Sequence, residues 1–195
     1  MKIGIDLDEV ILDYLSEIIK FYNTKNNKSI KKEQFNSYNF WEVWGGTREE
    51  AIQICDNFHN SEDFHNFKSI PGALDALNIL NKGNEIFIIT SRSLLWKEKT
   101  EKWIKDNINF SSPTIFSSDI YSKQGKTKLN ICKEFNIPIL LEDNANYSLE
   151  CANAGIKVIL FDKPWNKRAE HPNIIRVNNW YDAMHSIEQF KNTLS

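Results

Sequence analysis

Two aspartates, one residue apart, follow an apolar run at the start of the chain. The run Ile3-Gly4-Ile5 is typical of a buried strand, and Asp6 and Asp8 stand at its end. A buried carboxylate loses its hydration, which is costly unless an opposite charge or hydrogen bonds compensate for the loss. A pair of carboxylates at one strand end therefore predicts a bound cation, a proton-transfer role, or both.

Two later apolar runs also end in polar residues. The second run closes with Thr90, Ser91 and Arg92, and a later one closes with Glu142 and Asp143. In an open parallel sheet, ligands bind beyond the carboxyl ends of the strands. We therefore expect these ends to form one site with the aspartates of the first strand.

Carboxylates gathered at one edge of a sheet repel one another, which raises their pKa values unless a cation lies among them. A hard divalent cation that prefers oxygen ligands suits such a site, and we expect Mg²⁺. Beside a metal, hydroxyl groups, an arginine and a lysine would bind the non-bridging oxygens of a phosphate. Lys128, Lys126 and Lys123 compete as that lysine, and Lys128 is preferred because it stands at the expected start of a helix.

Short apolar runs alternate with helical patterns along the chain, which predicts an α/β protein with a mostly parallel sheet. The predicted strands span residues 3–6, 85–90, 114–116, 137–141, 157–161 and 174–177. The predicted helices span residues 74–80, 96–104, 128–135 and 148–154. A long insertion separates the first two strands, and within it residues 25–32, rich in lysine and asparagine, are expected to form a solvated loop.

The insertion is rich in aromatic residues, which have two possible roles. They are Phe35, Tyr38, Phe40, Trp41, Trp44, Phe58, Phe64 and Phe67. Most are expected to form the core of a small helical unit, which needs large side chains to bury enough surface. The alternative is that some rings stack on a nucleobase. Phe40, Trp41 and Trp44 are the candidates for stacking, because they cluster in a loop-like stretch that ends at Gly45-Gly46.

Two histidines of the insertion, His59 and His65, stand near Glu62 and Asp63 and could imitate a metal site. Their spacing matches no common pattern of metal ligands. We therefore expect both histidines to lie at the surface.

Composition narrows the class of partner. The chain has 195 residues, of which 41% are hydrophobic, and a formal net charge of -2. The absence of a basic bias argues against a nucleic-acid or membrane surface, so the expected partner is a small molecule. The cysteines Cys55, Cys132 and Cys151 are few and far apart, which suits reduced thiols in the cytoplasm. No signal peptide or membrane span is expected, and a homodimer is left open.

Four segments together resemble the motifs of the haloacid dehalogenase-like phosphatase superfamily, in the same order along the chain. They are Asp6-Leu7-Asp8-Glu9-Val10, Ile88-Ile89-Thr90-Ser91-Arg92, Lys128-Leu129-Asn130-Ile131-Cys132 and Leu140-Leu141-Glu142-Asp143-Asn144. Each segment alone is a weak signal, whereas four in sequence at strand ends are specific. Within the superfamily the chain most resembles the 5′(3′)-deoxyribonucleotidases, through Asp13, the Thr90-Ser91 pair and the segment from Leu160 to Asn166.

The resemblance implies a Rossmann-like three-layer α/β core and a small helical cap. The core would comprise residues 1–13 and 70–195, and the cap would comprise residues 14–69. The resemblance further implies that Asp6 is the nucleophile that forms an aspartyl phosphate. Asp8 would protonate the leaving oxygen and then activate the water that hydrolyses the intermediate.

The same resemblance implies how the metal and the phosphate are held. The ligands of Mg²⁺ would be the carboxylate of Asp6, the backbone carbonyl of Asp8, Asp143 and, directly or through water, Glu142. Many relatives carry Asp or Gly in place of Glu142. Thr90 and Lys128 would bind the transferring phosphoryl group, with Ser91 and Arg92 beside them.

The sequence therefore predicts a magnesium-dependent phosphomonoesterase, and in particular a nucleotidase acting on (deoxy)nucleoside monophosphates. A phosphatase for another small metabolite, such as a sugar phosphate, is the alternative enzyme. A non-catalytic phosphate-binding protein is the alternative outside enzymes, and the retention of all four motifs argues against it.

Overall fold

The computed structural model describes residues 1–118 and 125–194, and within them six strands form one parallel sheet. The strands are β1 (Lys2–Ile5), β2 (Glu85–Thr90), β3 (Thr114–Phe116), β4 (Ile139–Glu142), β5 (Lys157–Phe161) and β6 (Ile174–Val177). Their order across the sheet is β3-β2-β1-β4-β5-β6, with every neighbouring pair parallel. The predicted fold class is confirmed.

Both faces of the sheet are apolar, which explains why helices cover each of them. Ile86 and Ile88 of β2 join one hydrophobic cluster, whereas the alternate residues Phe87 and Ile89 join a second one. The helices that follow the insertion are α4 (Ala73–Leu80), α5 (Lys97–Asn107), α6 (Lys128–Phe135), α7 (Ala145–Asn153) and α8 (Trp180–Leu194). Buried apolar residues of α4, α5 and α8 belong to the first cluster, and those of α6 and α7 belong to the second.

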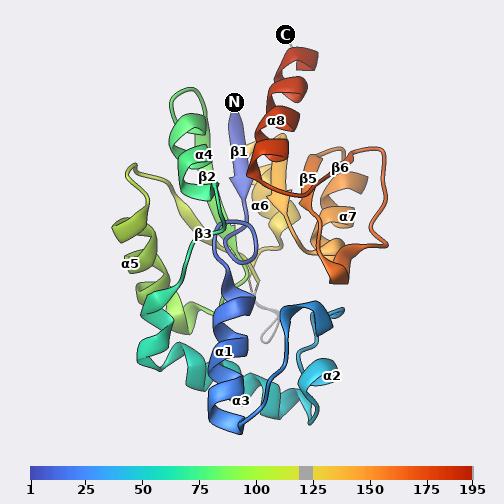
Figure 1. Cartoon of the computed structure of the whole chain (residues 1–195). Helices are drawn as coiled ribbons and strands as arrows, with labels where there is room; N and C mark the ends of the chain where they lie inside the picture. The colour runs from blue at the N-terminus through green and yellow to red at the C-terminus, as the bar shows by residue number, and fades with distance from the viewer. Residues whose placement is uncertain (119–124, 195) are drawn as a thin grey trace.

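Residues 14–69, called here the inserted segment, are mainly helical and lie beyond the carboxyl end of β1 (Figure 1). The segment contains α1 (Tyr14–Asn26), η1 (Lys32–Gln34), α2 (Trp41–Trp44), α3 (Arg48–His59) and η2 (Glu62–Asn66). Helix α3 begins with a capping box, in which Thr47 and Glu50 each accept a backbone hydrogen bond from the other. Most of the aromatic residues that were expected to form the core of the inserted segment are buried: Phe35, Trp44, Phe58, Phe64 and Phe67.

Several element boundaries differ from the prediction. Residues 25–32 are not one solvated loop, because α1 continues to Asn26 and Lys32 forms ion pairs of 2.9 Å with Glu9 and 2.6 Å with Asp13. The predicted helix at 96–104 is the 3₁₀ turn η3 (Leu94–Trp96) followed by α5. Helix α8 and the 3₁₀ turn η4 (Pro164–Asn166) were not predicted. Among the described helices, none has the length and hydropathy that crossing a bilayer requires.

Candidate active site

The acidic residues meet where the strand order reverses, between β1 and β4. The backbone N–H of Asp6 donates to the carbonyl of Leu141 at 2.9 Å, which places Asp6 beside the end of β4. Glu142 and Asp143 follow Leu141, and both are buried, as is Asp6. This position is the usual ligand crevice of an open parallel sheet, so the predicted meeting of these strand ends is confirmed.

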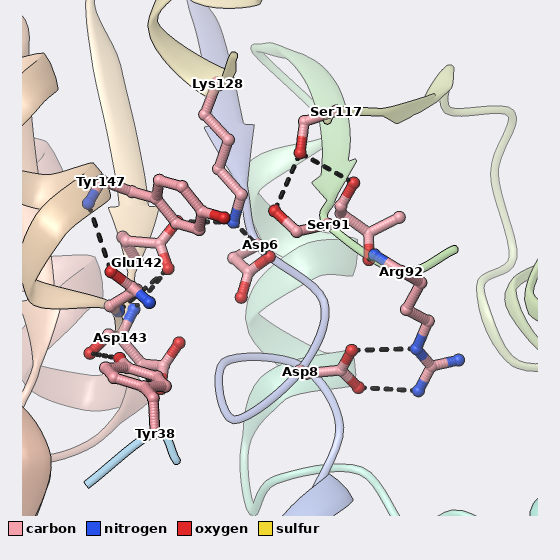
Figure 2. Close-up of polar contacts among 12 residues, drawn as sticks. Asp6, Asp8, Tyr38, Ser91, Arg92, Ser117, Lys128, Glu142, Asp143 and Tyr147 are labelled. Carbon is pink, nitrogen blue, oxygen red and sulfur yellow. Dashed lines mark hydrogen bonds and ion pairs between the residues drawn. The ribbon is translucent and has the colours of Figure 1, made fainter. Parts of the chain in front are cut away.

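Lys128 is buried among these carboxylates. Its Nζ lies 2.6 Å from Asp6 Oδ1 and 2.6 Å from Glu142 Oε2 (Figure 2). Thr127 begins α6 as its N-cap, accepting from the N–H of Asn130 at 3.2 Å, and so directs the first helical residue toward the sheet edge. Of the competing lysines, Lys126 is exposed and pairs with Glu134. Lys123 lies outside the described residues. Lys128 is therefore the lysine of this site.

The buried carboxylates have perturbed pKa values. Burial, and then the charge of Glu142, raises the pKa of Asp6 to about 8 against the opposing effect of Lys128. Burial, and then the charges of Glu142 and Asp6, raise the pKa of Asp143 well above its usual range. One oxygen each from Asp6, Glu142 and Asp143 lie within 4.8 Å of one another. Three buried carboxylates with a single lysine favour a divalent cation as a further counter-charge, so this set fits the expected Mg²⁺.

Asp143 is held by side chains that were not predicted to contact it. Tyr38 of the inserted segment donates from its hydroxyl to the Asp143 carbonyl at 2.6 Å and to Oδ2 at 3.2 Å. Trp165 Nε1 donates to the same Oδ2 at 2.9 Å, and Asn166 Nδ2 donates to the carbonyl at 2.7 Å. Such contacts orient a metal ligand. In the sequence, the one indication of these contacts was that Trp165 and Asn166 fall in the segment that resembles the deoxyribonucleotidases.

Thr90, Ser91 and Arg92 occupy the end of β2 but take different positions. Thr90 is 1% exposed, and its Oγ1 accepts from the N–H of Arg92 at 3.2 Å. Ser91 lines the cavity, and its Oγ lies 2.8 Å from that of Ser117. Arg92 forms a two-bond ion pair with Asp8, from Nε to Oδ2 at 2.9 Å and from Nη2 to Oδ1 at 2.7 Å. Asp8 is therefore turned toward Arg92 and away from Glu142 and Asp143 (Figure 2).

A cavity of about 220 Å³ joins the acidic cluster to an apolar pocket. Its polar end includes Asp6, Asp8, Ser91, Lys128 and Asp143. Its apolar end is formed mainly by the inserted segment, with Tyr14, Phe35, Phe40, Trp41, Ala51, Ile52 and Cys55. The cavity therefore suits a ligand with an anionic group at one end and a flat apolar group at the other.

Trp44, one of the three stacking candidates, does not line this cavity. Its ring stacks on Tyr22 at a centroid distance of 4.5 Å, and Tyr22 donates from its hydroxyl to the Trp44 carbonyl at 3.2 Å. Trp44 is only 8% exposed because it closes the core of the inserted segment. The proposed stacking role is wrong for Trp44, whereas Phe40 and Trp41 both lie at the cavity.

The prediction of a surface position is also wrong for His59, which is 1% exposed. Its ring stacks on Trp96 at 3.5 Å with an interplanar angle of 4°, and Nδ1 lies 2.6 Å from the Cys55 carbonyl. Burial, and then the charge of Arg92, lowers the pKa of His59 to about 3. The side chain of His65 lies outside the described part of the structure.

The sequence also matches a family model over almost its full length. The family is described as "5' nucleotidase, deoxy (Pyrimidine), cytosolic type C protein", and the match covers residues 1–192. The chain belongs to this nucleotidase family. This nucleotidase is accordingly a phosphoric monoester hydrolase with a haloacid dehalogenase-like fold.

Curated relatives of this nucleotidase carry similar names. It is 27% identical to "Putative nucleotidase YqfW" of Bacillus subtilis, covering all of this chain and 97% of the relative. It is 25% identical to "Nucleotidase CA_C3379" of Clostridium acetobutylicum, covering 92% of this chain and 90% of the relative.

Solved structures of similar fold are haloacid dehalogenase-like hydrolases. SP0104 from Streptococcus pneumoniae has a TM-score of 0.70 at 14% identity, covering 95% of this chain and 97% of the other. YfnB from Bacillus subtilis, whose structure was determined bound to magnesium, has a TM-score of 0.59 at 14% identity and covers 95% of this chain and 97% of its own. At these identities the likeness concerns the fold alone.

Proposed function

We propose that this nucleotidase is a magnesium-dependent enzyme that hydrolyses (deoxy)nucleoside monophosphates through an aspartyl-phosphate intermediate. One observation carries the proposal: a single cavity joins the cluster of Asp6, Lys128 and Asp143 to the aromatic residues Phe40 and Trp41. The first end suits a phosphate group and the second a nucleobase. The family description, which names deoxy and pyrimidine nucleotides, supports this substrate class.

In the proposed first step, a carboxylate oxygen of Asp6 attacks phosphorus and forms an Asp6–phosphoryl bond. The bond between phosphorus and the nucleoside oxygen breaks, and Asp8 donates a proton to that leaving oxygen. In the second step, water attacks the phosphorus and the Asp6–phosphoryl bond breaks, while Asp8 accepts the proton of the water. The products are a nucleoside and inorganic phosphate, and both aspartates return to their starting states.

The remaining polar residues would bind the phosphoryl group and the cation. Lys128, Thr90 and Ser91 are proposed to bind phosphoryl oxygens, because Lys128 begins α6 beside Asp6 and the other two stand at the end of β2. The groups proposed to hold Mg²⁺ are the carboxylates of Asp6, Asp143 and Glu142 and the backbone carbonyl of Asp8. When bound, Mg²⁺ would offset the negative charge of the carboxylates and the phosphate.

The inserted segment is proposed to act as a cap that recognises the base. It contributes most of the apolar end of the cavity, and Tyr38 joins it to Asp143 at the polar end. Stacking of Phe40 or Trp41 on the base would contribute about 1–3 kcal/mol to binding. A sugar phosphate offers no flat apolar group for these rings, so the pocket favours a nucleotide.

The test is phosphate release from nucleoside 5′- and 3′-monophosphates and from sugar phosphates, with Mg²⁺ and with EDTA. We expect metal-dependent release, fastest from nucleotides, and a loss of about 10⁴-fold or more in Asp6→Asn. Equal or faster release from sugar phosphates would reject the proposed substrate class. Unchanged turnover in Asp6→Asn would reject the proposed nucleophile.

A further inference from the structure

The guanidinium group of Arg92 is buried and donates hydrogen bonds to two side chains of the protein. Arg92 and its partner Asp8 both line the cavity, but the Arg92 side chain is only 3% exposed, whereas the Asp8 side chain is 27% exposed. Two nitrogens of Arg92 bind the two oxygens of Asp8, at 2.9 Å and 2.7 Å. A third nitrogen, Nη1, donates to Thr100 Oγ1 of α5 at 3.3 Å. Three of the five N–H donors of Arg92 are thus engaged within the protein.

Aromatic rings of the inserted segment enclose the same guanidinium group. Its central carbon lies 5.6 Å from the ring centroid of Tyr14, 5.3 Å from that of Phe64 and 5.0 Å from that of Phe67. Rings at these distances attract a cation and restrict its position. Arg92 is therefore held both by the hydrogen bond that it donates to Thr100 and by three aromatic rings.

We infer that Arg92 is a positioning residue that acts through Asp8, and that it is not a ligand of the phosphate. The inference rests on the proposed function, in which Asp8 moves a proton to the leaving oxygen and from water. Asp8 directly precedes a turn in which Glu9 has a positive φ of 61°, and the Asp8 carboxylate lies on the Arg92 side of the site (Figure 2). A planar fork that binds both oxygens fixes the direction of this carboxylate, as a single ammonium group cannot.

This assignment changes the expectation drawn from the sequence, which placed Arg92 beside the phosphate with Ser91. The contacts to Asp8 and Thr100 and the surrounding rings leave Arg92 directed at the proton-transferring carboxylate. Because Tyr14, Phe64 and Phe67 belong to the inserted segment, the packing of that segment also sets the direction of Asp8. The inserted segment would thereby contribute both to substrate binding, through the cavity, and to proton transfer, through Arg92 and Asp8.

The test is a double-mutant cycle with Arg92→Lys, Asp8→Asn and the double variant. For each, kcat and KM are measured with a nucleoside 5′-monophosphate and with p-nitrophenyl phosphate, and Ki is measured for inorganic phosphate. We expect Arg92→Lys to lower kcat for the nucleotide about 10²-fold, with KM and Ki changed less than about 2-fold. The loss should be smaller with p-nitrophenyl phosphate, whose leaving group needs little protonation. Arg168→Lys, at an exposed position, is the matched control.

The cycle distinguishes an Arg92 that positions Asp8 from an Arg92 that binds phosphate. If Arg92 acts through Asp8, the double variant is no slower than Asp8→Asn. If the loss from Arg92→Lys persists in the Asp8→Asn background, or if Ki for phosphate rises about 10-fold or more, Arg92 binds phosphate and the inference is wrong. If Arg92→Lys does not fold, Phe67→Leu, which removes a ring from the guanidinium but stays apolar, is placed in the same cycle.

Failure of the inference about Arg92 can also be distinguished from failure of the proposed function. A wild-type protein that hydrolyses p-nitrophenyl phosphate but no nucleotide would reject the proposed substrate. The cycle would still be measured with p-nitrophenyl phosphate, and additive losses there would reject the role of Arg92 independently.

Discussion

The Nζ of Lys128 lies 2.6 Å from Oδ1 of Asp6, and both groups are buried. The two residues are 122 positions apart in the chain, and the pair forms because α6 begins at the carboxyl end of the central strands. Lys128 also binds Glu142, so one cation compensates two carboxylates within the site.

Removal of the Lys128 ammonium group should destabilise the folded protein. We expect Lys128→Met to lower the free energy of unfolding by about 3–5 kcal/mol, because two buried carboxylates lose their counter-charge. Urea unfolding measures the change, and added Mg²⁺ should recover part of it in the variant. Lys126→Met, at an exposed position on the same segment, should change the free energy by less than about 0.5 kcal/mol. Equal effects of the two substitutions would contradict the central position of Lys128.

Removal of the Tyr38 hydroxyl should weaken metal binding. Tyr38 orients Asp143 by donating to its carbonyl and to Oδ2. We expect Tyr38→Phe to raise the Mg²⁺ concentration for half-maximal activity about 10-fold or more. Tyr181→Phe, on an exposed ring, is the control and should leave the Mg²⁺ dependence unchanged. A Tyr38→Phe variant with the wild-type Mg²⁺ dependence would argue against a role of this contact.

The buried His59 should make stability sensitive to acid. The pKa of His59 in the folded protein, about 3, is below the ordinary histidine value of 6.5, so the unfolded chain binds the proton more readily. The contribution is complete above pH 6.5 and is lost as pH falls toward 3, at up to about 1.4 kcal/mol per pH unit. Urea unfolding at pH 7 and pH 5 should show a smaller loss in His59→Gln than in the wild type. The exposed His185→Gln serves as the control, and parallel losses in all three proteins would contradict this prediction.

The two neighbouring tryptophans of α2 should behave differently. Trp41 lines the cavity, so Trp41→Ala should raise KM for a nucleotide by the equivalent of about 1–3 kcal/mol. The same variant should leave KM for a phosphate ester without a ring nearly unchanged. Trp44 is packed on Tyr22, so Trp44→Ala should instead cost about 3–5 kcal/mol of folding free energy. Steady-state kinetics and urea unfolding of both variants test this, and interchanged effects would contradict the assignment.

The strand pattern and the chemical character of the site could be predicted from local sequence. Four of the six predicted strands have the observed bounds. A short apolar run indicates a strand, and the polar residues that follow it indicate where the strand ends. Parallel strands must present those ends along one edge, so the meeting of Asp6 with Glu142 and Asp143 followed from the fold class.

Side-chain partners were decided only by the tertiary structure. The burial of His59 depends on Trp96 lying against its ring, and the engagement of Arg92 depends on Asp8, 84 positions earlier in the chain. Trp41 and Trp44 are alike in local sequence, yet one faces the cavity and the other faces Tyr22. Local patterns determine which residues form strands and helices, whereas the neighbours of a side chain depend on how distant elements pack, because burial and charge pairing are properties of that packing.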